Sequence, residues 1–234
     1  MLPPPLAPSS LAIVMPVLNE AAGIDAALMA LMPLMARGVR VLVADGGSAD
    51  DTLAGARRID GVEVMPAPRG RAAQMNAGAL AARGAGVLVF LHADTTLPPD
   101  ADRLILRALA EGRHVWGRFD VRIAGRPWML RVVAAFMNAR SRWSGIATGD
   151  QALFMTRAAF DAVGGFPDQP LMEDIEMSKR LRTLSRPACL RQRVITSGRR
   201  WERHGVWATI VLMWRLRWAY WRGASPQVLA RRYE

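Results

Sequence analysis

The sequence contains very little cysteine and almost no lysine. Cys189 is the one cysteine, so an internal disulfide bond is excluded, and the composition fits a reducing compartment. Lys179 is the one lysine among 31 basic residues, so part of the arginine excess reflects overall composition rather than chemistry. Only three histidines are present and no G-x-S-x-G pattern occurs, which disfavours a Ser-His-Asp hydrolase.

Long apolar runs and the common phosphate-binding motifs are also missing. No apolar run approaches the roughly 20 residues that a membrane span needs, and the longest late run covers residues 206–214. No glycine fingerprint follows the first predicted strand and no P-loop pattern occurs, so a dinucleotide site and a P-loop enzyme are disfavoured. Residues 1–10 lack the basic and apolar regions of a signal peptide, and we expect a flexible leader.

Hydrophobic periodicity in the first half of the chain alternates between two kinds of segment. At 234 residues the chain suits one α/β domain, or one domain with an appendage, and half of it is hydrophobic. Buried strands are predicted at 11–18, 39–44, 62–65 and 87–91, and helices at 21–35, 70–83 and 102–111. This order predicts an α/β fold with a mostly parallel central sheet flanked by helices. Ser48 and Asp51 resemble a capping box that starts a further short helix in the first half.

The second half of the chain mixes both kinds of element. Residues 115–123 alternate, which predicts a half-exposed strand. Further strands are predicted at 152–156 and 190–196, and helices at 127–142, 158–163, 174–184 and 207–221.

Positive charge and tryptophan are concentrated at the C-terminal end. Residues 185–234 hold 11 arginines and 2 acidic residues, against a net charge of +11 for the whole chain. The same segment holds five of the eight tryptophans. Basic and aromatic residues together indicate nucleic acid, an anionic membrane surface or phosphorylated substrates, and the sequence leaves these open at this stage.

Three predicted parallel strands end in polar side chains. The first ends at Asn19-Glu20, the second at Asp45 and the fourth at His92-Ala93-Asp94. Ligands of open α/β sheets bind beyond the carboxyl ends of the strands, so these residues predict a cleft lined by carboxylates. Asp94 taken alone is equally consistent with a cap of the following helix.

The order of several motifs resembles that of a known enzyme family. The segments MPVLNE, VADGGSADDT, RGRAAQMNAGA, FLHADT, GDQALF, GGFPD and MEDIEMSKRLR occur in the order typical of family 2 glycosyltransferases with the GT-A fold. The resemblance covers roughly residues 13–201. The short chain and its ending are similar to the small bacterial branch described as radical-SAM/selenodomain-associated transferase 2, which says little about substrate.

The resemblance implies a site for a nucleotide-diphosphate sugar, most readily a UDP-sugar. Asp45 would read the nucleotide base and basic residues would face the phosphates. The residues implied on this donor side are Pro16, Asn19, Glu20, Asp45, Arg69, Arg71, Asn76, His92, Ala93, Asp94, Arg199 and Arg200. A helix-capping role for Asp45 and a solvated helix start for Arg69 and Arg71 are the structural alternatives.

His92-Ala93-Asp94 occupies the place of the family's D-x-D motif. The resemblance implies that Asp94 binds a divalent cation, Mn²⁺ or Mg²⁺, shared with the diphosphate. His92 departs from the family, which usually has Asp there, and imidazole suits Mn²⁺ better than Mg²⁺. His92 could instead hydrogen-bond the ribose or a phosphate.

Glu173-Asp174 matches the family's E-D motif at a helix start. The resemblance implies that Asp174 is the general base of an inverting transfer to a hydroxyl, with Glu173 assisting. The alternative is a pair of carboxylates placed by the helix dipole. The acceptor side would hold Gly149, Asp150, Gln151 and Trp201.

The family's processive members carry a Q-x-x-R-W motif where this chain has Arg199-Arg200-Trp201 without the glutamine pattern. A polymer-forming role is therefore disfavoured, although either arginine could clamp the diphosphate. His204 is a weak metal candidate. The departures at these positions and at His92 leave a second hypothesis open, a non-catalytic protein that binds sugar nucleotides or docks at membranes.

Together these features predict a leader at 1–10, a GT-A domain at 11–201 and an amphipathic, basic and aromatic helical extension at 202–234. The extension is expected either to pack on the domain or to lie at an anionic membrane. We expect a cytoplasmic enzyme, or a peripheral one at the inner face of the cytoplasmic membrane. Its acceptor carries a hydroxyl and is either soluble or lipid-linked, and nucleic acid is not expected as a partner.

Overall fold

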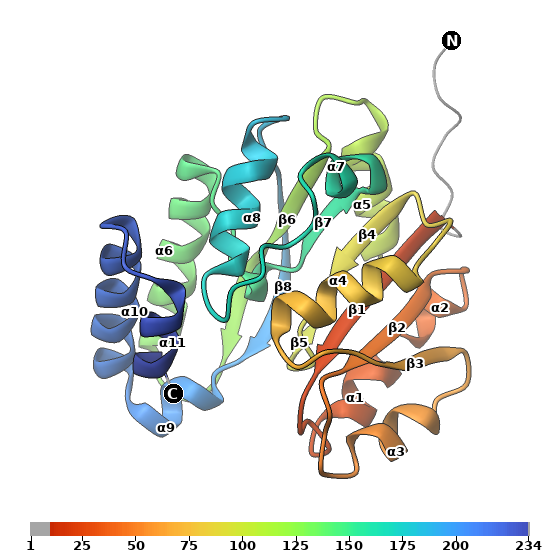
Figure 1. Cartoon of the computed structure of the whole chain (residues 1–234), viewed down its shortest axis with the longest axis horizontal. Coiled ribbons are helices and arrows are strands. Elements are labelled where there is room, and N and C mark those ends of the chain that lie inside the picture. Colours follow the sequence, from red (N-terminus) through yellow and green to blue (C-terminus); the bar gives the residue numbers. More distant parts are fainter. Residues whose placement is uncertain (1–9, 234) are drawn as a thin grey trace.

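The computed structural model describes residues 10–233, which form a central sheet covered by helices on both faces (Figure 1). The leader predicted for residues 1–10 lies almost wholly outside this range. The described strands are β1 Leu11–Val17, β2 Arg40–Asp45, β3 Val62–Pro66, β4 Val87–Phe90, β5 Thr95–Thr96, β6 Trp116–Ala124, β7 Leu153–Thr156 and β8 Ala188–Ser197.

The described helices are α1 Ile24–Met29, α2 Met32–Met35, α3 Thr52–Arg57, α4 Arg71–Ala81, α5 Ala101–Ala110, α6 Met129–Ser144, α7 Arg157–Ala162, α8 Glu173–Arg182, α9 Arg199–His204, α10 Val206–Trp221 and α11 Pro226–Tyr233. A short 3-10 helix, η2, covers Gly149–Gln151.

The sheet order within the described chain is β3-β2-β1-β4-β7-β6-β8-β5. The first four strands run parallel, as the alternation of elements predicted. β7 is antiparallel to both of its neighbours, and β5 is antiparallel to β8. β6 and β8 are parallel to each other. The predicted fold class, an α/β fold with a mostly parallel central sheet, is therefore confirmed.

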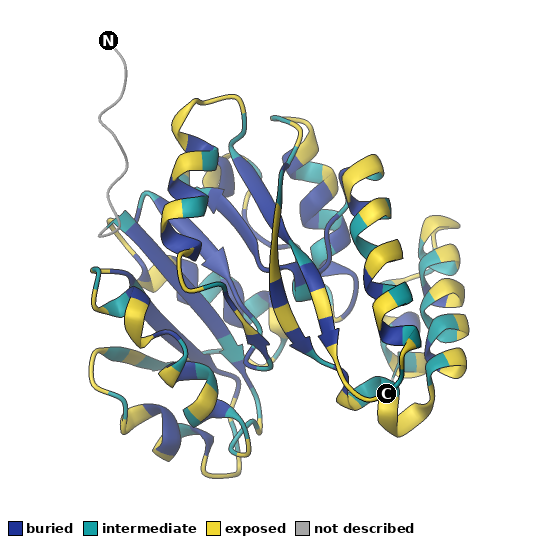
Figure 2. Ribbon diagram, turned by 180° about the vertical axis from the view of Figure 1, so that it is seen from behind, coloured by how far each residue is buried: buried dark blue, intermediate teal, exposed yellow. Residues whose placement is uncertain are grey.

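Successive residues of β1 point to opposite faces of the sheet, as the geometry of a strand requires. Leu11, Ile13 and Met15 enter one buried cluster, which includes side chains of α1, α2, α5 and α6. Ala12 and Val14 enter a second cluster with α4, α7 and α8. Because both faces are covered, the strand has no polar face, and Figure 2 shows β1 buried along its length.

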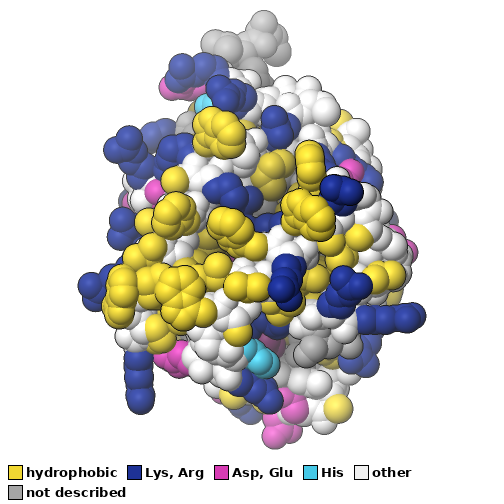
Figure 3. Space-filling model, turned by 90° about the vertical axis from the view of Figure 1, so that its left-hand side faces the viewer, with side chains coloured by type: hydrophobic (Ala, Val, Ile, Leu, Met, Phe, Trp, Pro, Cys, Tyr) yellow, Lys and Arg dark blue, Asp and Glu magenta, His cyan; other side chains and the backbone are white. Residues whose placement is uncertain are grey.

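A smaller third cluster joins the C-terminal helices to the rest of the protein. Leu216 of α10 and Leu229 of α11 pack with Leu171, Met172 and Ile175 at the start of α8. The opposite side of α10 faces solvent, where hydrophobic side chains gather among arginines (Figure 3). The helix is apolar on both sides, so the prediction of an amphipathic extension is wrong for α10.

Three further local predictions need correction. The single helix predicted over 21–35 is two short helices with a break at Ala30–Leu31, just before Pro33. The predicted capping box does not form, because the Ser48 hydroxyl donates to Asp45 instead of capping α3. The strand predicted as half-exposed is buried through most of its length, and exposed positions alternate only toward the end of β6.

Sequence periodicity missed the shortest elements: β5 and α9 were not predicted, and α11 was predicted only as part of the helical extension at 202–234. β5 has two residues and α9 has six, too few to show a period. α9 also runs across the predicted domain boundary after residue 201. Within residues 10–233, no helix combines the length and the apolar character that crossing a membrane would take.

Candidate functional site

The loops that follow β1 and β2 are tied together at the carboxyl edge of the sheet. The two strands are parallel and in register, with Val17 beside Asp45. Asn19, which has a left-handed backbone with φ of 56°, donates its N–H to Ser48 Oγ and accepts from the Ala49 N–H, both at 2.9 Å. Its side chain thus fixes the relative position of the two loops predicted to hold the nucleotide.

Asp45 is buried and holds the turn that follows β2. Its carboxylate accepts from the N–H groups of Gly47 and Ser48 at 3.0–3.2 Å, and from the Ser48 hydroxyl at 2.5 Å. This is the capping alternative that the sequence left open, although the site of the cap is a turn rather than a helix. A contact with a nucleotide base through Asp45 stays a prediction.

Gln74 on α4 supports the same edge; it lies in the RGRAAQMNAGA segment, but no role was predicted for it. Its Nε2 donates to the carbonyl oxygens of Val17 at 2.7 Å and Ala44 at 2.8 Å, the ends of β1 and β2. The side chain is 4% exposed. A buried glutamine that satisfies two strand-end carbonyls keeps both loops aligned, and only tertiary structure reveals such a partner.

Asp94 lies beside Glu20 and Arg199, which are far away in sequence. After β4 the chain passes Asp94 and enters β5, which pairs with the last residues of β8, and the Ser197 N–H donates to the Asp94 carbonyl at 3.1 Å. Arg199 Nη2 therefore lies 3.4 Å from Glu20 Oε2 and 4.0 Å from Asp94 Oδ2. The structure brings these three predicted donor-side residues together.

The surroundings of Asp94 suit a cation that is shared with a substrate. No group of three or more His, Cys, Asp or Glu side chains positioned for a metal occurs among residues 10–233. The Asp94 side chain is 32% exposed, and the only hydrogen bond described for its carboxylate is a long one, 3.3 Å, from the Thr95 hydroxyl. One accessible carboxylate fits Mg²⁺ or Mn²⁺ bound mainly by substrate phosphates, rather than an all-protein metal cage.

His92 faces the loop around Gly149 and Asp150. Its Nδ1 lies 3.5 Å from Asp150 Oδ1, and its ring lies so close to Gly149 that an added Cβ there would come within 2.4 Å of Cε1. A larger residue at 149 would therefore displace the histidine ring. Burial acts to raise the pKa of Asp150, but hydrogen bonding to His92 and the charges of His92, Arg71 and Arg217 outweigh it and lower that pKa.

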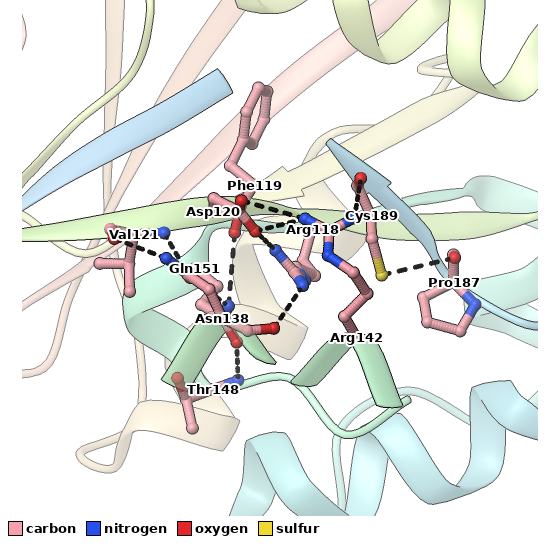
Figure 4. A network of polar contacts seen from close by, with 10 residues as sticks. All are labelled: Arg118, Phe119, Asp120, Val121, Asn138, Arg142, Thr148, Gln151, Pro187 and Cys189. Carbon is pink, nitrogen blue, oxygen red and sulfur yellow. Dashed lines mark hydrogen bonds and ion pairs between the residues drawn. The ribbon is translucent and has the colours of Figure 1, made fainter. Parts of the chain in front are cut away.

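A polar network beneath η2 holds this loop in place (Figure 4). Gln151 is fully buried; its Oε1 accepts from the Thr148 N–H at 3.2 Å and its Nε2 donates to Asn138 Oδ1 at 3.3 Å. Asn138 in turn makes both hydrogen bonds to the backbone of Val121 in β6. Gln151 therefore positions Gly149 and Asp150, and its burial argues against the direct acceptor contact that was predicted.

Glu173 and Asp174 are the first two residues of α8, and the residue before them has a strained backbone. Met172, just before the helix, has a left-handed backbone with φ of 66°. Asp174 Oδ2 accepts from the Gly149 N–H at 2.9 Å, which links the E-D motif to the loop that touches His92. Arg71 Nη1 lies 3.2 Å from Glu173 Oε1. Burial, and next the charge of Asp174, raise the pKa of Glu173 despite the opposing charge of Arg71.

Two arginines of this region, Arg140 and Arg217, were not predicted. Arg140 of α6 has buried Nε and Nη2 atoms without a hydrogen-bond partner in the described part of the chain. Burial lowers the pKa of Arg140 to about 10, with a further lowering by Arg217 of α10, while Asp174 acts in the opposite direction. Their sequence positions are ordinary helix arginines in an arginine-rich chain, so nothing in the sequence distinguished them.

The remaining predicted residues lie outside this group of contacts. Arg69 is exposed, and Pro16 lies within β1. Asn76 exchanges two hydrogen bonds with the backbone of Phe166, so its amide is used in holding that loop. Arg200 donates to the Tyr233 carbonyl at 2.6 Å and stacks on its ring. Trp201 packs partly buried against the main core.

Comparison with known proteins identifies the family. The model of glycosyl transferase family 2 matches residues 12–166, more than half of the chain. The chain belongs to this family. The matched segment contains β1 to β7, with Asp45, Asp94 and Asp150, and it ends before the E-D motif of α8. No curated protein shows a significant match to the sequence.

Several solved glycosyltransferases share the fold. A mannosyltransferase from Pyrobaculum calidifontis, in complex with GDP-Man and Mn²⁺, has a TM-score of 0.58 and 19% identity, covering 81% of this chain and 58% of that chain. Glucosyl-3-phosphoglycerate synthase from Mycobacterium tuberculosis, in complex with Mn²⁺, UDP and glucosyl-3-phosphoglycerate, has a TM-score of 0.57 and 21% identity, covering 78% of this chain and 70% of that chain. S. aureus TarS 1-349 in complex with UDP-GlcNAc has a TM-score of 0.65 and 15% identity, covering 80% of this chain and 58% of that chain.

These similarities confirm the predicted resemblance to family 2 glycosyltransferases and the GT-A type of fold. At 15–21% identity the solved structures carry the fold alone. This family 2 chain spans only 58% of the mannosyltransferase chain, so the relatives hold substantial segments that it does not match. The narrower resemblance to one small bacterial branch stays a prediction.

Proposed function

We propose that this family 2 protein is a metal-dependent inverting glycosyltransferase that moves a sugar from a nucleotide-diphosphate donor to a hydroxyl acceptor. One observation carries the proposal. His92, two residues before Asp94, packs on Gly149, whose N–H is bound by Asp174. The carboxylate proposed for the donor side and the carboxylate proposed as base are therefore joined through one loop.

The donor is bound at the carboxyl edge of β1, β2 and β4. The tied loops around Asn19 and Asp45 receive the nucleoside, and Arg199 faces the diphosphate beside Asp94. UDP is the favoured nucleotide because Asp45 can accept a hydrogen bond from uracil. Two solved relatives are described with UDP or UDP-GlcNAc and one with GDP-Man, which supports a sugar-nucleotide donor without fixing its base.

Asp94 would hold a divalent cation, which when bound neutralises charge on the departing diphosphate. Mn²⁺ is favoured over Mg²⁺ if His92 also contacts it, and Mn²⁺ is present in two of the relatives. His92 faces Asp150, however, and this contact favours a role for its imidazole in orienting the sugar or the loop. Arg199 supplies fixed positive charge for the same leaving group.

Asp174 is the proposed general base. One of its oxygens is fixed by the Gly149 N–H, which orients the carboxylate for taking the proton of a hydroxyl that attacks the anomeric carbon. Glu173 is buried and its carboxylate is held by Arg71, so it assists by positioning Arg71 while Asp174 takes the proton. The attack of one hydroxyl in a single displacement inverts the anomeric centre.

The acceptor is expected to enter between α6, α8 and α10, where Arg140 interacts with Asp174 and Arg217 interacts with Arg140 and Asp150. We propose a hydroxyl acceptor that is lipid-linked or otherwise apolar, because the outer faces of α6 and α10 next to this region are rich in exposed tryptophan. The protein would then work in the cytoplasm, as a peripheral protein at the inner face of the cytoplasmic membrane.

The test is release of nucleoside diphosphate from a panel of UDP- and GDP-sugars with Mn²⁺, with and without a membrane-lipid extract as acceptor source. Turnover that depends on Mn²⁺ and disappears in Asp94→Ala and Asp174→Asn would support the proposal. Full activity of both variants would show that the site is assigned to the wrong residues.

A second candidate function is a non-catalytic protein that binds sugar nucleotides. His92 in the D-x-D position and the lack of a Q-x-x-R-W motif favour it. Calorimetry separates the two, because this candidate predicts UDP binding of equal strength with Mn²⁺ and with EDTA, and no turnover of any donor. The accessible Asp94 and the link between Asp174 and Gly149 favour the enzyme.

A further inference from the structure

α10 carries a regular stripe of large hydrophobic side chains on its solvent side. Trp207, Val211, Trp214, Trp218 and Trp221 recur every three or four residues, and each is exposed. Such spacing places them along one face of a helix over about 21 Å. Stripes of this kind normally face a core or a partner, yet the tryptophans here are 61–79% exposed.

α6 extends the same surface. Trp128, Phe136 and Trp143 occur at intervals of about two helical turns and are 71–85% exposed. Figure 3 shows that hydrophobic side chains cluster on this side of the molecule, with Lys and Arg side chains among them and few acidic ones. We refer to these three residues and the five of α10, all exposed and hydrophobic, as the aromatic face.

The charge of the two helices has one sign. Neither α6 nor α10 contains Asp or Glu, and they carry the five arginines Arg131, Arg140, Arg142, Arg215 and Arg217. Arg215 is exposed beside the stripe, and Arg222 follows the helix and lies over the Trp218 ring at 5.1 Å. Arg142 is paired with Asp120, but Arg215 and Arg222 add positive charge directly beside the rings of the aromatic face.

The inner side of α10 packs next to the proposed catalytic carboxylates. Leu216 shares a cluster with Met172 and Ile175, the residues on either side of Glu173-Asp174. Tyr220 lies 3.3 Å from Glu176 on the same α8 helix. A surface that docks on the outside of α10 therefore lies one helix away from Asp174.

We propose that the aromatic face docks this protein flat on the surface of an anionic lipid bilayer. Indole rings prefer the headgroup zone, where the ring meets the acyl chains and the N–H stays hydrated, and arginines beside them pair with lipid phosphates. A second copy of the chain is disfavoured as occupant, because it would bring the same arginines and no carboxylates from these helices. The overall charge of +11 favours an anionic surface in the same way.

This inference rests on the peripheral location given in the proposed function and deepens it. Docking is measured without any sugar nucleotide, so its failure is distinguishable from a failure of the proposed catalysis. The probe is a vesicle of phosphatidylcholine with about one-third phosphatidylglycerol, compared with vesicles of phosphatidylcholine alone and read out by co-sedimentation. The wild type is expected to bind the anionic vesicles, with a partition coefficient that falls as salt is raised.

The deciding variant is Trp214→Ala/Trp218→Ala, whose exposed side chains contribute little to the fold. We expect its partition coefficient to fall about tenfold or more, because two interfacial anchors are lost. Met29→Ala/Leu80→Ala removes two exposed hydrophobic side chains elsewhere and is expected to bind within about twofold of wild type. Circular dichroism and thermal unfolding confirm that both variants are folded.

A charge pair sharpens the test. Arg215→Glu on the aromatic face is expected to weaken binding about tenfold, whereas Arg107→Glu on the exposed side of α5 makes the same change in net charge with at most about a twofold effect. Equal effects of these two variants, or unchanged binding of Trp214→Ala/Trp218→Ala, would overturn the proposal. A dimeric wild type that does not bind vesicles would also overturn it, if light scattering shows that the tryptophan variant is monomeric. Binding to a single-stranded oligonucleotide in preference to anionic vesicles would also overturn it.

Discussion

Two buried charged groups, Asp102 in the donor half and Arg140 in the acceptor half, differ in how they are satisfied. In the donor half, residues 10–111, the carboxylate of Asp102 is fully buried and receives two hydrogen bonds from Arg37 at 2.7 and 2.8 Å. Around Asp174, in the acceptor half, the buried Nε and Nη2 atoms of Arg140 meet no hydrogen-bond partner in the described part of the chain, and Arg217 repels it. Asp102 is therefore satisfied within the fold, whereas two buried nitrogens of Arg140 are not.

The difference indicates which region is built for stability and which for binding. A buried guanidinium without a partner costs folding free energy, so such a group is expected where a ligand later supplies the missing negative charge. The strained Met172 and the exposed aromatic face belong to the same half. The donor half shows the opposite pattern, with its loops tied by Asn19, Asp45 and Gln74 before any ligand arrives.

The largest effect is expected from the acceptor half. Asp174→Asn keeps the shape of the side chain but cannot take a proton, so kcat should fall by about 10³-fold with little change in donor affinity. Nucleoside-diphosphate release measures kcat, and calorimetry with UDP measures affinity. Glu176→Gln, on the same helix, is the matched control and should retain activity within about twofold. An active Asp174→Asn would move the base to another residue, and Glu173→Gln would be examined next.

The second-largest effect is expected at Asp94, which is proposed to bind the cation. Asp94→Asn should weaken UDP binding in the presence of Mn²⁺ by about 100-fold, because the cation loses its protein carboxylate. Removing the metal with EDTA should weaken binding of the wild type by the same factor, and it should not affect the variant. If EDTA weakens both proteins equally, the cation is held by residues other than Asp94.

The ion pair beneath the donor half should control stability without affecting catalysis. Arg37→Met leaves Asp102 buried and unpaired, and we expect a loss of about 2–3 kcal/mol in the free energy of unfolding measured with urea. Arg40→Met removes the more exposed pair with Glu63 and should cost less than about 1 kcal/mol. Equal losses in the two variants would contradict the distinction between buried and exposed pairs.

The same pair predicts a dependence of stability on pH. The hydrogen bond from Arg37 holds the pKa of Asp102 below its ordinary value of 3.8, against the opposing effect of burial. A carboxyl group whose pKa is lower in the folded state contributes stability above its unfolded pKa. This contribution should disappear as pH falls below about 4 and through the folded pKa. Urea unfolding of wild type and Arg37→Met between pH 7 and 3, roughly, should therefore converge at the acid end.

The smallest effect tests the unpaired arginine. Arg140→Met should leave the free energy of unfolding unchanged or raise it by about 1 kcal/mol, because it removes a buried charge without a partner. Turnover should nevertheless fall about tenfold, since a positive charge near Asp174 is lost. Arg142→Met is the control on the same helix: it breaks the pair with Asp120 and should cost stability instead. A destabilised Arg140→Met would show that the guanidinium is satisfied in the fold.

Local sequence signals predicted the regular elements well because burial on both faces leaves a clear pattern. The apolar runs of β1, β2 and β4 and the helical periods of α4 and α5 lie within two residues of their predicted bounds. The break between α1 and α2 and the two-residue β5 were missed, since elements this short carry no period. Asp94 and the Glu173-Asp174 pair were identified through their motif order, not through periodicity.

The sequence by itself determined the family, the parallel arrangement of the first strands and the carboxylates at their edge, because each depends on neighbouring residues or on motif order. Only the tertiary structure decided which charges meet. Pairing of β5 with β8 places Arg199 beside Asp94, and packing of α6 and α10 near α8 places Arg140 near both Asp174 and Arg217. The same packing leaves the tryptophans of α10 in solvent. Long-range contacts of this kind depend on how distant segments pack together in the folded protein, and no local sequence pattern predicts them.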